Sequence, residues 1–215
     1  MIADPRAVAA RWPEARVRIL AELAVIVTET PWLPAPVTGL TDDEVLHAIA
    51  LSAYFGHLNR IADAVGVPLD YTVRHLPPHA EAATPPLGSA SRTVLANLDR
   101  LAKRGPTALA LVAWRDHVFE RDAPLAHRQR AMIARHVGAL LGHAVAGATP
   151  TSSIDAELVE LAEVVTLAPW KLGSSVFAPL RAAGYDDAAL FDACVVASTA
   201  GVLSRITVAL ATLDR

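Results

Sequence analysis

The chain has 215 residues, of which 53% are hydrophobic and 19% charged, and its formal net charge is −3. This length suffices for a substantial core in one domain or in two closely packed halves, and the apolar content predicts surface buried against a partner subunit. The weak negative charge argues against nucleic-acid binding, and the single cysteine excludes an internal disulfide framework and fits a reducing compartment.

The spacing of apolar residues predicts helices along nearly the whole chain. From Thr41 to Val65 apolar residues recur at steps of three and four, with Thr41 as the N-cap and Gly66 as the stop. A second long helix is predicted at about 185–213. Further helices are predicted at about 5–28, 90–103, 106–120, 125–146 and 154–167. No run of alternating β-branched residues appears, so the predicted fold is all-α.

Neither end of the chain predicts a targeting or membrane-spanning segment. Charged residues such as Asp4 and Arg6 interrupt any apolar run at the start, which argues against a signal peptide. Near the C-terminus the longest uncharged stretch, Ala193–Ser204, is shorter than the roughly 20 residues that a membrane span needs. We therefore expect a soluble, cytoplasmic protein.

One motif occurs twice, and a matching helix follows each copy. The ten residues 23–32 recur at 161–170, where six of the ten are identical and both copies end in Pro-Trp. The helices downstream also match, at an offset of 145 residues. The matched pairs are Asp42 and Asp187, Ala48 and Ala193, Gly56 and Gly201, Leu58 and Leu203, Arg60 and Arg205, Ile61 and Ile206, and Ala64 and Ala209. This predicts an internally duplicated helical module, with similar environments for Trp32 and Trp170.

Proline content predicts the boundary between the two copies. Four prolines fall within the ten positions 77–86, as expected of a linker or a segment wrapped over the surface. The predicted organisation is therefore a partial module at 1–73, a Pro-rich linker at 74–88 and a second module at 89–215.

The earlier helix also resembles a known family, and residues near its C-terminal end carry the likeness. These residues are Phe55, Asn59, Arg60, Ile61, Ala62, Asp63 and Gly66. They resemble the second half of the AhpD-like alkylhydroperoxidase and carboxymuconolactone decarboxylase superfamily, in particular its peroxidase-related branch. The stretch 180–187 is similar to the helix-connecting turn of that family. The resemblance implies an AhpD-like helical fold and an alkylhydroperoxidase or decarboxylase ancestry.

The residues that carry the family's chemistry are missing from this chain. The family uses a Glu, a Cys-x-x-Cys and a His on one helix, where a thiolate attacks and a second thiol resolves the sulfenic acid. In this sequence the Glu position holds Ala131, the two Cys positions hold His143 and Ala146, and the His position holds Pro150. Thiol peroxidase chemistry by the family route is therefore not expected, and whether the protein is an enzyme stays open.

A polar stripe in the earlier helix is the first candidate site. Asp43, His47, Tyr54 and His57 lie on one helix face, with Arg60 beyond them, and the later copy retains only the arginine. Tyr54, His57 and Arg60 are candidate ligand-binding residues. The stripe is equally typical of a solvated face or of a hydrogen-bond network between subunits.

Three other polar features have structural and functional interpretations. Arg60 and Arg205 are expected to be buried and to tie helix ends together, or else to capture a small carboxylic acid. Cys194 lies among apolar residues and is expected to be structural. His143, at the family's nucleophile position, and His136 are candidate catalytic residues, His143 as a general base. They lie two helical turns apart, about 10 Å, which is too far to share one metal ion.

The sequence leaves two classes of function open, and neither needs a cofactor or a metal. In the first, the protein is a non-redox enzyme or small-molecule binder, with a pocket drawn from His143, His136, Tyr54, His57 and Arg60. In the second, it is a catalytically silent scaffold or partner subunit of an AhpD-like assembly. In both, we expect a homo-oligomer that contacts neither nucleic acid nor membrane.

Overall fold

The computed structural model describes residues 11–35, 37–68, 106–143 and 148–213, and within them the protein is all-helical, as predicted. The α-helices are α2 (Ala15–Glu29), α3 (Asp42–Ala64), α5 (Pro106–Phe119), α6 (His127–Leu140), α7 (Ser153–Leu167), α8 (Ser174–Ala182) and α9 (Asp187–Leu213). A short 3₁₀ helix at Pro169–Lys171 lies between α7 and α8. These described parts of the chain contain no strand.

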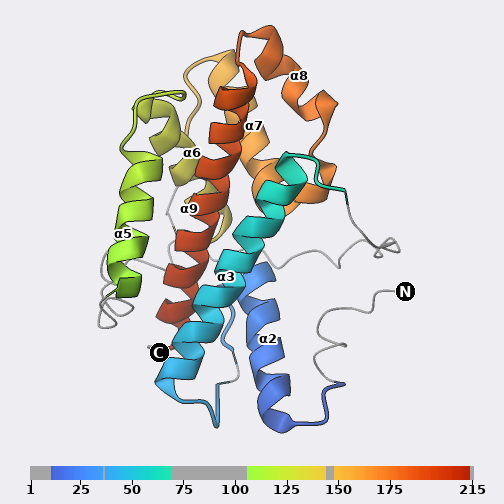
Figure 1. Cartoon of the computed structure of the whole chain (residues 1–215), viewed down its shortest axis with the longest axis vertical. Coiled ribbons are helices and arrows are strands. Elements are labelled where there is room, and N and C mark those ends of the chain that lie inside the picture. Colours follow the sequence, from blue (N-terminus) through green and yellow to red (C-terminus); the bar gives the residue numbers. More distant parts are fainter. Residues whose placement is uncertain (1–10, 36, 69–105, 144–147, 214–215) are drawn as a thin grey trace.

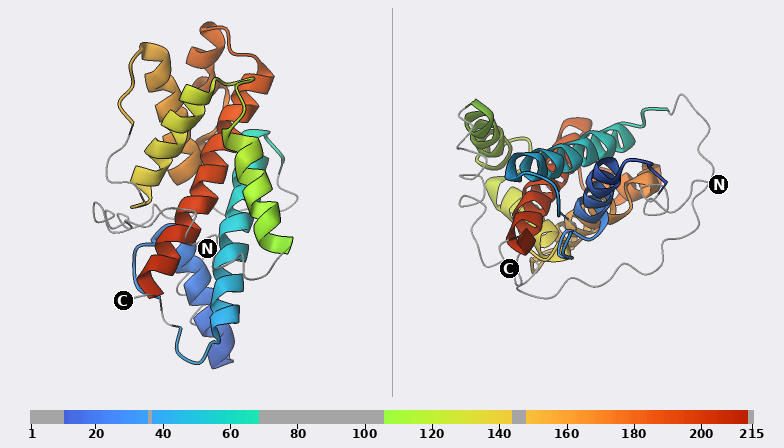
Figure 2. Two further views of the ribbon diagram at one scale, coloured as in Figure 1. Left: turned by 90° about the vertical axis from the view of Figure 1, so that its left-hand side faces the viewer. Right: turned by 90° about the horizontal axis from the view of Figure 1, so that it is seen from below.

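Helix α9 forms the centre of the molecule. Helices α3, α6 and α7 pack along it, with α5 beside it and α2 near its C-terminal half (Figure 1). The end-on view in Figure 2 shows α9 surrounded by its neighbours. Nearly every residue from Ala189 to Leu210 is therefore buried, including polar ones. Part of the high apolar content of the sequence is explained by this enclosed helix rather than by a subunit interface.

Helix α9 is also long and apolar enough to cross a membrane, although its longest uncharged stretch, Ala193–Ser204, is shorter than a membrane span requires. In the described part of the chain it is the one helix with that property, and 94% of the relevant window is buried inside the protein. The core helix of a soluble protein has the same length and composition, so this feature fits the expectation of a soluble fold.

The predicted start and stop of α3 are confirmed. The Thr41 hydroxyl accepts a hydrogen bond from the Glu44 backbone N–H, and the Glu44 carboxylate accepts from the Thr41 N–H, which completes a capping box. At the other end Gly66 has a φ of 67°, a conformation that favours glycine and ends the helix.

Five details of the predicted elements need correction or lie outside the described residues. Of the helix predicted at about 5–28, residues 5–10 lie outside the described residues and α2 begins at Ala15; α6 ends at Leu140 rather than at 146. Helix α8 was not predicted, because it is short, contains Pro179 and lacks a side-chain N-cap. The predicted helix at 90–103 and the predicted linker at 74–88 lie outside the described residues.

The two sequence halves share their cores. One cluster joins Leu23 and Val27 of α2 and Ile49 of α3 to Ile206 and Leu210 of α9. A second cluster packs Trp32, from the loop after α2, among residues of α6, α7 and α9. The residues before and after the predicted linker therefore stabilise each other.

Candidate functional site

The paired arginines are buried where helices α2 and α7 end. Arg60 donates to the carbonyls of Gly56 at 2.7 Å and Thr166 at 3.1 Å. Arg205 donates to the carbonyls of Thr28 at 3.1 Å, Gly201 at 3.3 Å and Thr166 at 3.4 Å. Since Thr28 and Thr166 lie in the last turns of their helices, both guanidiniums meet the negative end of a helix dipole. The predicted burial of both arginines, with hydrogen bonds to carbonyls near helix C-termini, is thus confirmed.

Matched residues around these arginines make the same contacts. A Cβ on Gly56 would lie 2.8 Å from the Arg60 guanidinium, and one on Gly201 would lie 2.9 Å from that of Arg205. Glycine therefore leaves room for an arginine four residues later. The hydroxyls of Thr28 and Thr166 each donate to the carbonyl four residues earlier. These likenesses support the duplicated module, which stays a prediction.

The two guanidiniums repel each other within the core. Burial lowers the pKa of Arg60 to about 10, and the neighbouring Asp63 carboxylate partly offsets that effect. Burial lowers the pKa of Arg205 well below its ordinary value, and the charge on Arg60 lowers it further. Neither arginine lines the described pockets, so capture of a carboxylic acid by Arg60 has no support from the geometry.

The expectation of similar environments for the two Pro-Trp tryptophans is wrong. Trp32 is 8% exposed and belongs to the core, whereas Trp170 is 64% exposed in the 3₁₀ helix. The longer connection in the later copy contains α8, which the earlier copy lacks. The 3₁₀ helix that carries Trp170 lies against α3 and α7, whereas Trp32 packs among α6, α7 and α9.

Tyr54 and His57 lie together, but they meet α5 and α9 rather than the other candidates. The Trp114 ring of α5 lies edge-on to both, with ring centroids 6.2 Å from Tyr54 and 5.0 Å from His57. His57 Nδ1 lies 2.7 Å from the buried Ser198 hydroxyl. Burial, and then the charge on Arg60, lowers the pKa of His57. Because Ser198 is buried, this pair is better suited to joining α3 to α9 than to attacking a substrate.

The two candidate catalytic histidines contact different helices. His143 follows the end of α6, and its Nδ1 lies 3.2 Å from the Ser204 hydroxyl of α9. His136 Nε2 lies 3.8 Å from a carboxylate oxygen of Glu163 on α7. Both ring nitrogens of His136 are buried and make no hydrogen bond within the described residues. The structure therefore does not bring these histidines and the Tyr54–His57 pair around one cavity.

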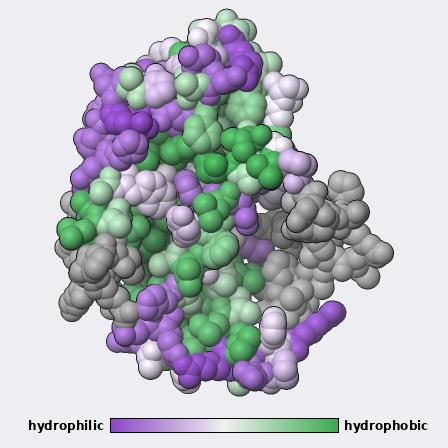
Figure 3. All heavy atoms as spheres, viewed as in Figure 1, coloured by the Kyte–Doolittle hydropathy of each residue, from purple (hydrophilic) through white to green (hydrophobic). Residues whose placement is uncertain are grey.

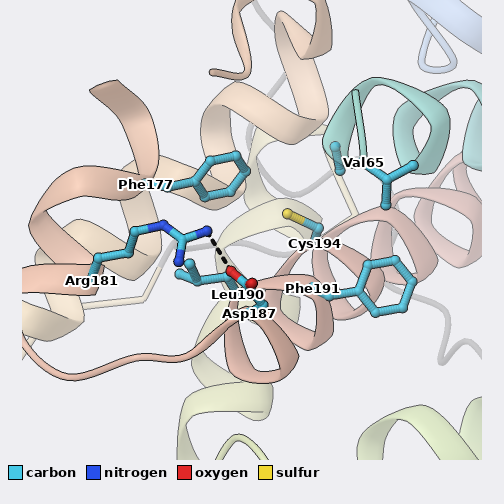
Figure 4. A pocket seen from close by; sticks show the side chains of 8 residues that line it. Val65, Phe177, Arg181, Asp187, Leu190, Phe191 and Cys194 are labelled. Atoms are coloured by element: carbon cyan, nitrogen blue, oxygen red, sulfur yellow. Dashed lines mark hydrogen bonds and ion pairs between the residues drawn. The ribbon is translucent and has the colours of Figure 1, made fainter. Parts of the chain in front are cut away.

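A pocket of about 360 Å³ lies instead between the C-terminal end of α3, helix α8 and the start of α9. Figure 4 shows its walls and the side chains that face it. The lining residues are Ala64, Val65, Phe177, Arg181, Asp187, Leu190, Phe191 and Cys194. Most are apolar, and the volume falls in the usual range for small-molecule sites, about 300–1,000 Å³.

The polar end of this pocket is a single ion pair. Arg181 of α8 donates to Asp187 of α9 at 2.5 Å, as Figure 4 shows. Both side chains are more than half exposed, and this bond uses one of the five N–H donors of the guanidinium. The first turn of α9 lies beside them and adds the positive end of a helix dipole.

Cys194 forms part of the inner wall of the pocket. It is 1% exposed, and burial raises the pKa of its thiol to about 12. The thiol is therefore protonated near neutral pH and serves as a small apolar group rather than a nucleophile. The expected structural role of this residue agrees with its surroundings.

None of the five candidate residues named from the sequence lines this pocket. Its two charged residues, Arg181 and Asp187, could nevertheless have been singled out from the sequence. Both fall in the stretch 180–187, which is similar to the connecting turn of the family. Sequence reasoning also missed a buried network in which Arg130 pairs with Asp192 and donates to the carbonyls of Val118 and Ala123. That network joins the turn between α5 and α6 to α9.

Within the residues that the structure describes, no group of three His, Cys, Asp or Glu side chains is placed to hold a metal ion. Comparison of the chain with protein-family models, with curated proteins and with solved structures gave no match.

Proposed function

We propose that this protein binds a small carboxylic acid with an apolar body in the pocket between α3, α8 and α9. The observation that carries the proposal is the pocket itself, which has apolar walls and one polar end. An apolar body would lie between the rings of Phe177 and Phe191. Its carboxylate would accept hydrogen bonds from the N–H groups of Arg181 that are not bonded to Asp187.

The negative charge of Asp187 disfavours a carboxylate ligand, but other groups at the pocket favour one. The Asp187 carboxylate would repel that of the ligand, but it is largely exposed to water, which screens the repulsion. Arg181 and the start of α9 both favour an anion at the same place. The proposal therefore predicts that Asp187 weakens binding without preventing it.

The proposed chemistry excludes a thiol redox step. The chain has one cysteine, and its thiol is buried with a raised pKa. We further propose that the protein is of the AhpD-like and carboxymuconolactone decarboxylase helical type but has lost the cysteine pair of that superfamily. No other property of the superfamily is used in the proposal. His136 and His143, which lie apart from the pocket, have no part in the proposed binding.

Titration calorimetry with three matched probes tests this proposal. Benzoate, benzyl alcohol and benzylamine share one ring and differ in charge, so we expect benzoate to bind tightest. Phe177→Ala should weaken benzoate binding, because it removes an apolar wall. Asp187→Asn should strengthen it several-fold, because it removes the repelling charge.

Two results would contradict the assignment. If benzylamine bound tightest and Asp187→Asn abolished its binding, the pocket would be a site for cations. If none of the probes bound at millimolar concentration, the second class of function, a catalytically silent scaffold or partner subunit, would be favoured.

A further inference from the structure

The outer face of α3 carries apolar side chains that the other described helices leave about half exposed, although Tyr54 also meets the edge of the Trp114 ring of α5. Five large side chains on this face are between 42% and 59% exposed. With the half-buried Ala62 they form the α3 stripe: Leu51, Tyr54, Phe55, Leu58, Ala62 and Val65. Figure 3 shows hydrophobic residues along the middle of the face on which α3 lies in front of α9.

The same helix packs into the core through its opposite face. Val45, Ile49 and Ala53 are buried there against α2 and α9. Helix α3 is therefore apolar on two sides, whereas a surface helix of a monomer is expected to have one apolar face. Packing within the described chain accounts for only one of them.

The spacing of the stripe favours another helix as its partner. Leu51, Phe55, Leu58, Ala62 and Val65 follow one another at steps of four, three, four and three residues. This is the spacing at which two helices interlock their side chains along a shared seam. A two-fold axis would bring the stripe of a second copy against the first, because such an interface uses the same surface on both partners.

The exposed area is also sufficient for such a pair. A fully exposed aromatic side chain presents about 150–250 Å² and leucine and valine somewhat less, so two aromatic and three aliphatic side chains about half exposed present at most on the order of 500 Å² per copy. Two copies would bury up to about 1,000 Å² from these side chains alone, which is close to the lower limit for specific interfaces. Polar residues at the rim would add to that area.

Charge decides the direction of pairing. Helix α3 begins with Asp42, Asp43 and Glu44, of which Glu44 is paired with Arg16, and a parallel pair would bring this acidic first turn of one copy beside that of the other. In an antiparallel pair centred on Leu58 they would lie on the order of 40 Å apart, at 1.5 Å per residue. Antiparallel pairing would also oppose Leu51 of one copy to Val65 of the other.

We infer that two copies of this protein pair through their α3 stripes, antiparallel, with Leu58 near the two-fold axis. The inference does not require the proposed ligand, although Val65 belongs both to the stripe and to the pocket wall. It assigns the partner surface of the expected homo-oligomer to one named face, and it fixes which residues meet.

Sedimentation of matched variants tests the interface. The wild type should sediment as a dimer at micromolar concentration, and Leu58→Glu should weaken self-association at least a hundredfold, giving a monomer with an unchanged helical circular-dichroism spectrum. Leu167→Glu on α7 is the control, because Leu167 is exposed to a similar extent, 48% against 42%, and lies outside the stripe. A monomeric wild type, or a dimer that Leu58→Glu leaves intact, would overturn the inference.

Disulfide trapping tests the direction. Leu58→Cys should form a cross-linked dimer under mild oxidation, whereas the wild type should not, since Cys194 is buried. Leu51→Cys alone should stay uncross-linked, but a mixture of Leu51→Cys and Val65→Cys should cross-link. Cross-linking of Leu51→Cys with itself would show a parallel pair. A monomer that binds phosphatidylcholine vesicles through the stripe would assign this face to lipid instead, and would equally overturn the inference.

Discussion

Helices α3 and α9 carry the same Gly-x-x-x-Arg motif, yet their surroundings differ. Both arginines donate to the glycine carbonyl and to the carbonyl of Thr166. Helix α9, however, is enclosed for most of its length, whereas α3 keeps one apolar face exposed. What the two helices share holds the fold together. What differs between them, the outer face of α3 and the inserted α8, forms the proposed interface and one wall of the proposed pocket.

The largest expected difference between the two halves concerns the two tryptophans. Trp32→Ala removes a buried ring from the core and should lower the free energy of unfolding by about 3–5 kcal/mol. Trp170→Ala changes an exposed ring and should alter that free energy by less than about 0.5 kcal/mol. Urea unfolding followed by circular dichroism measures both. Equal losses would mean that the two Pro-Trp turns have the same role after all.

A smaller change in the free energy of unfolding tests the glycine–arginine contact that α3 and α9 share. Its sign should depend on whether the arginine is present. Gly201→Ala should destabilise the protein by about 1 kcal/mol, because the new methyl group displaces the buried guanidinium of Arg205. In an Arg205→Met background the same change should stabilise it by up to about 1 kcal/mol, because alanine favours helix and the clash is gone. The Arg205→Met single variant is the reference for the second measurement.

The smallest expected effect is a pH dependence of the free energy of unfolding that arises from His57 of α3 and has no counterpart in α9. Burial lowers the folded-state pKa of His57, so the unfolded state binds the proton more tightly. The stability of the protein should therefore fall as the pH drops below about 6.5, the ordinary histidine value, towards the lower folded pKa. His57→Gln should remove part of that loss. The matched residue of α9 is Val202, which cannot titrate. A loss of stability on raising the pH through this range would contradict the assignment.

The sequence predicted these shared features because local signals determine them. The N-cap at Thr41 and the stop at Gly66 in α3, and the glycine–arginine spacing that α3 and α9 share, all depend on residues within a few positions of each other. The all-α fold followed from the apolar periodicity, and the burial of Arg60 and Arg205 from their retention among apolar neighbours in both helices. The apolar spacing of α3 did not reveal which of its two apolar faces would be covered. Periodicity shows which residues share a helix face, but not which other helix packs against that face.

The pocket could not be predicted for a different reason. Its walls come from Val65 at the end of α3, Phe177 and Arg181 of α8 and Phe191 of α9, and only the tertiary arrangement brings these segments together. Helix α8 itself carries weak local signals, with Pro179 inside it. The candidate residues Tyr54, His57, His136 and His143 were recognised by residue type, and their partners Ser198, Ser204 and Glu163 lie on other helices.

Arg60 should stabilise the fold and Arg181 should bind the ligand, and a matched pair of variants separates the two roles. Unfolding free energy and benzoate affinity are measured for Arg60→Met and Arg181→Gln. We expect Arg60→Met to lose about 2 kcal/mol of stability, because it leaves buried carbonyls unpaired, and to keep its benzoate affinity. Arg181→Gln should keep its stability within about 0.5 kcal/mol, since its ion pair is exposed, and lose benzoate affinity about tenfold or more. The reverse outcome, an Arg60→Met protein of unchanged stability that no longer binds benzoate, would contradict the account.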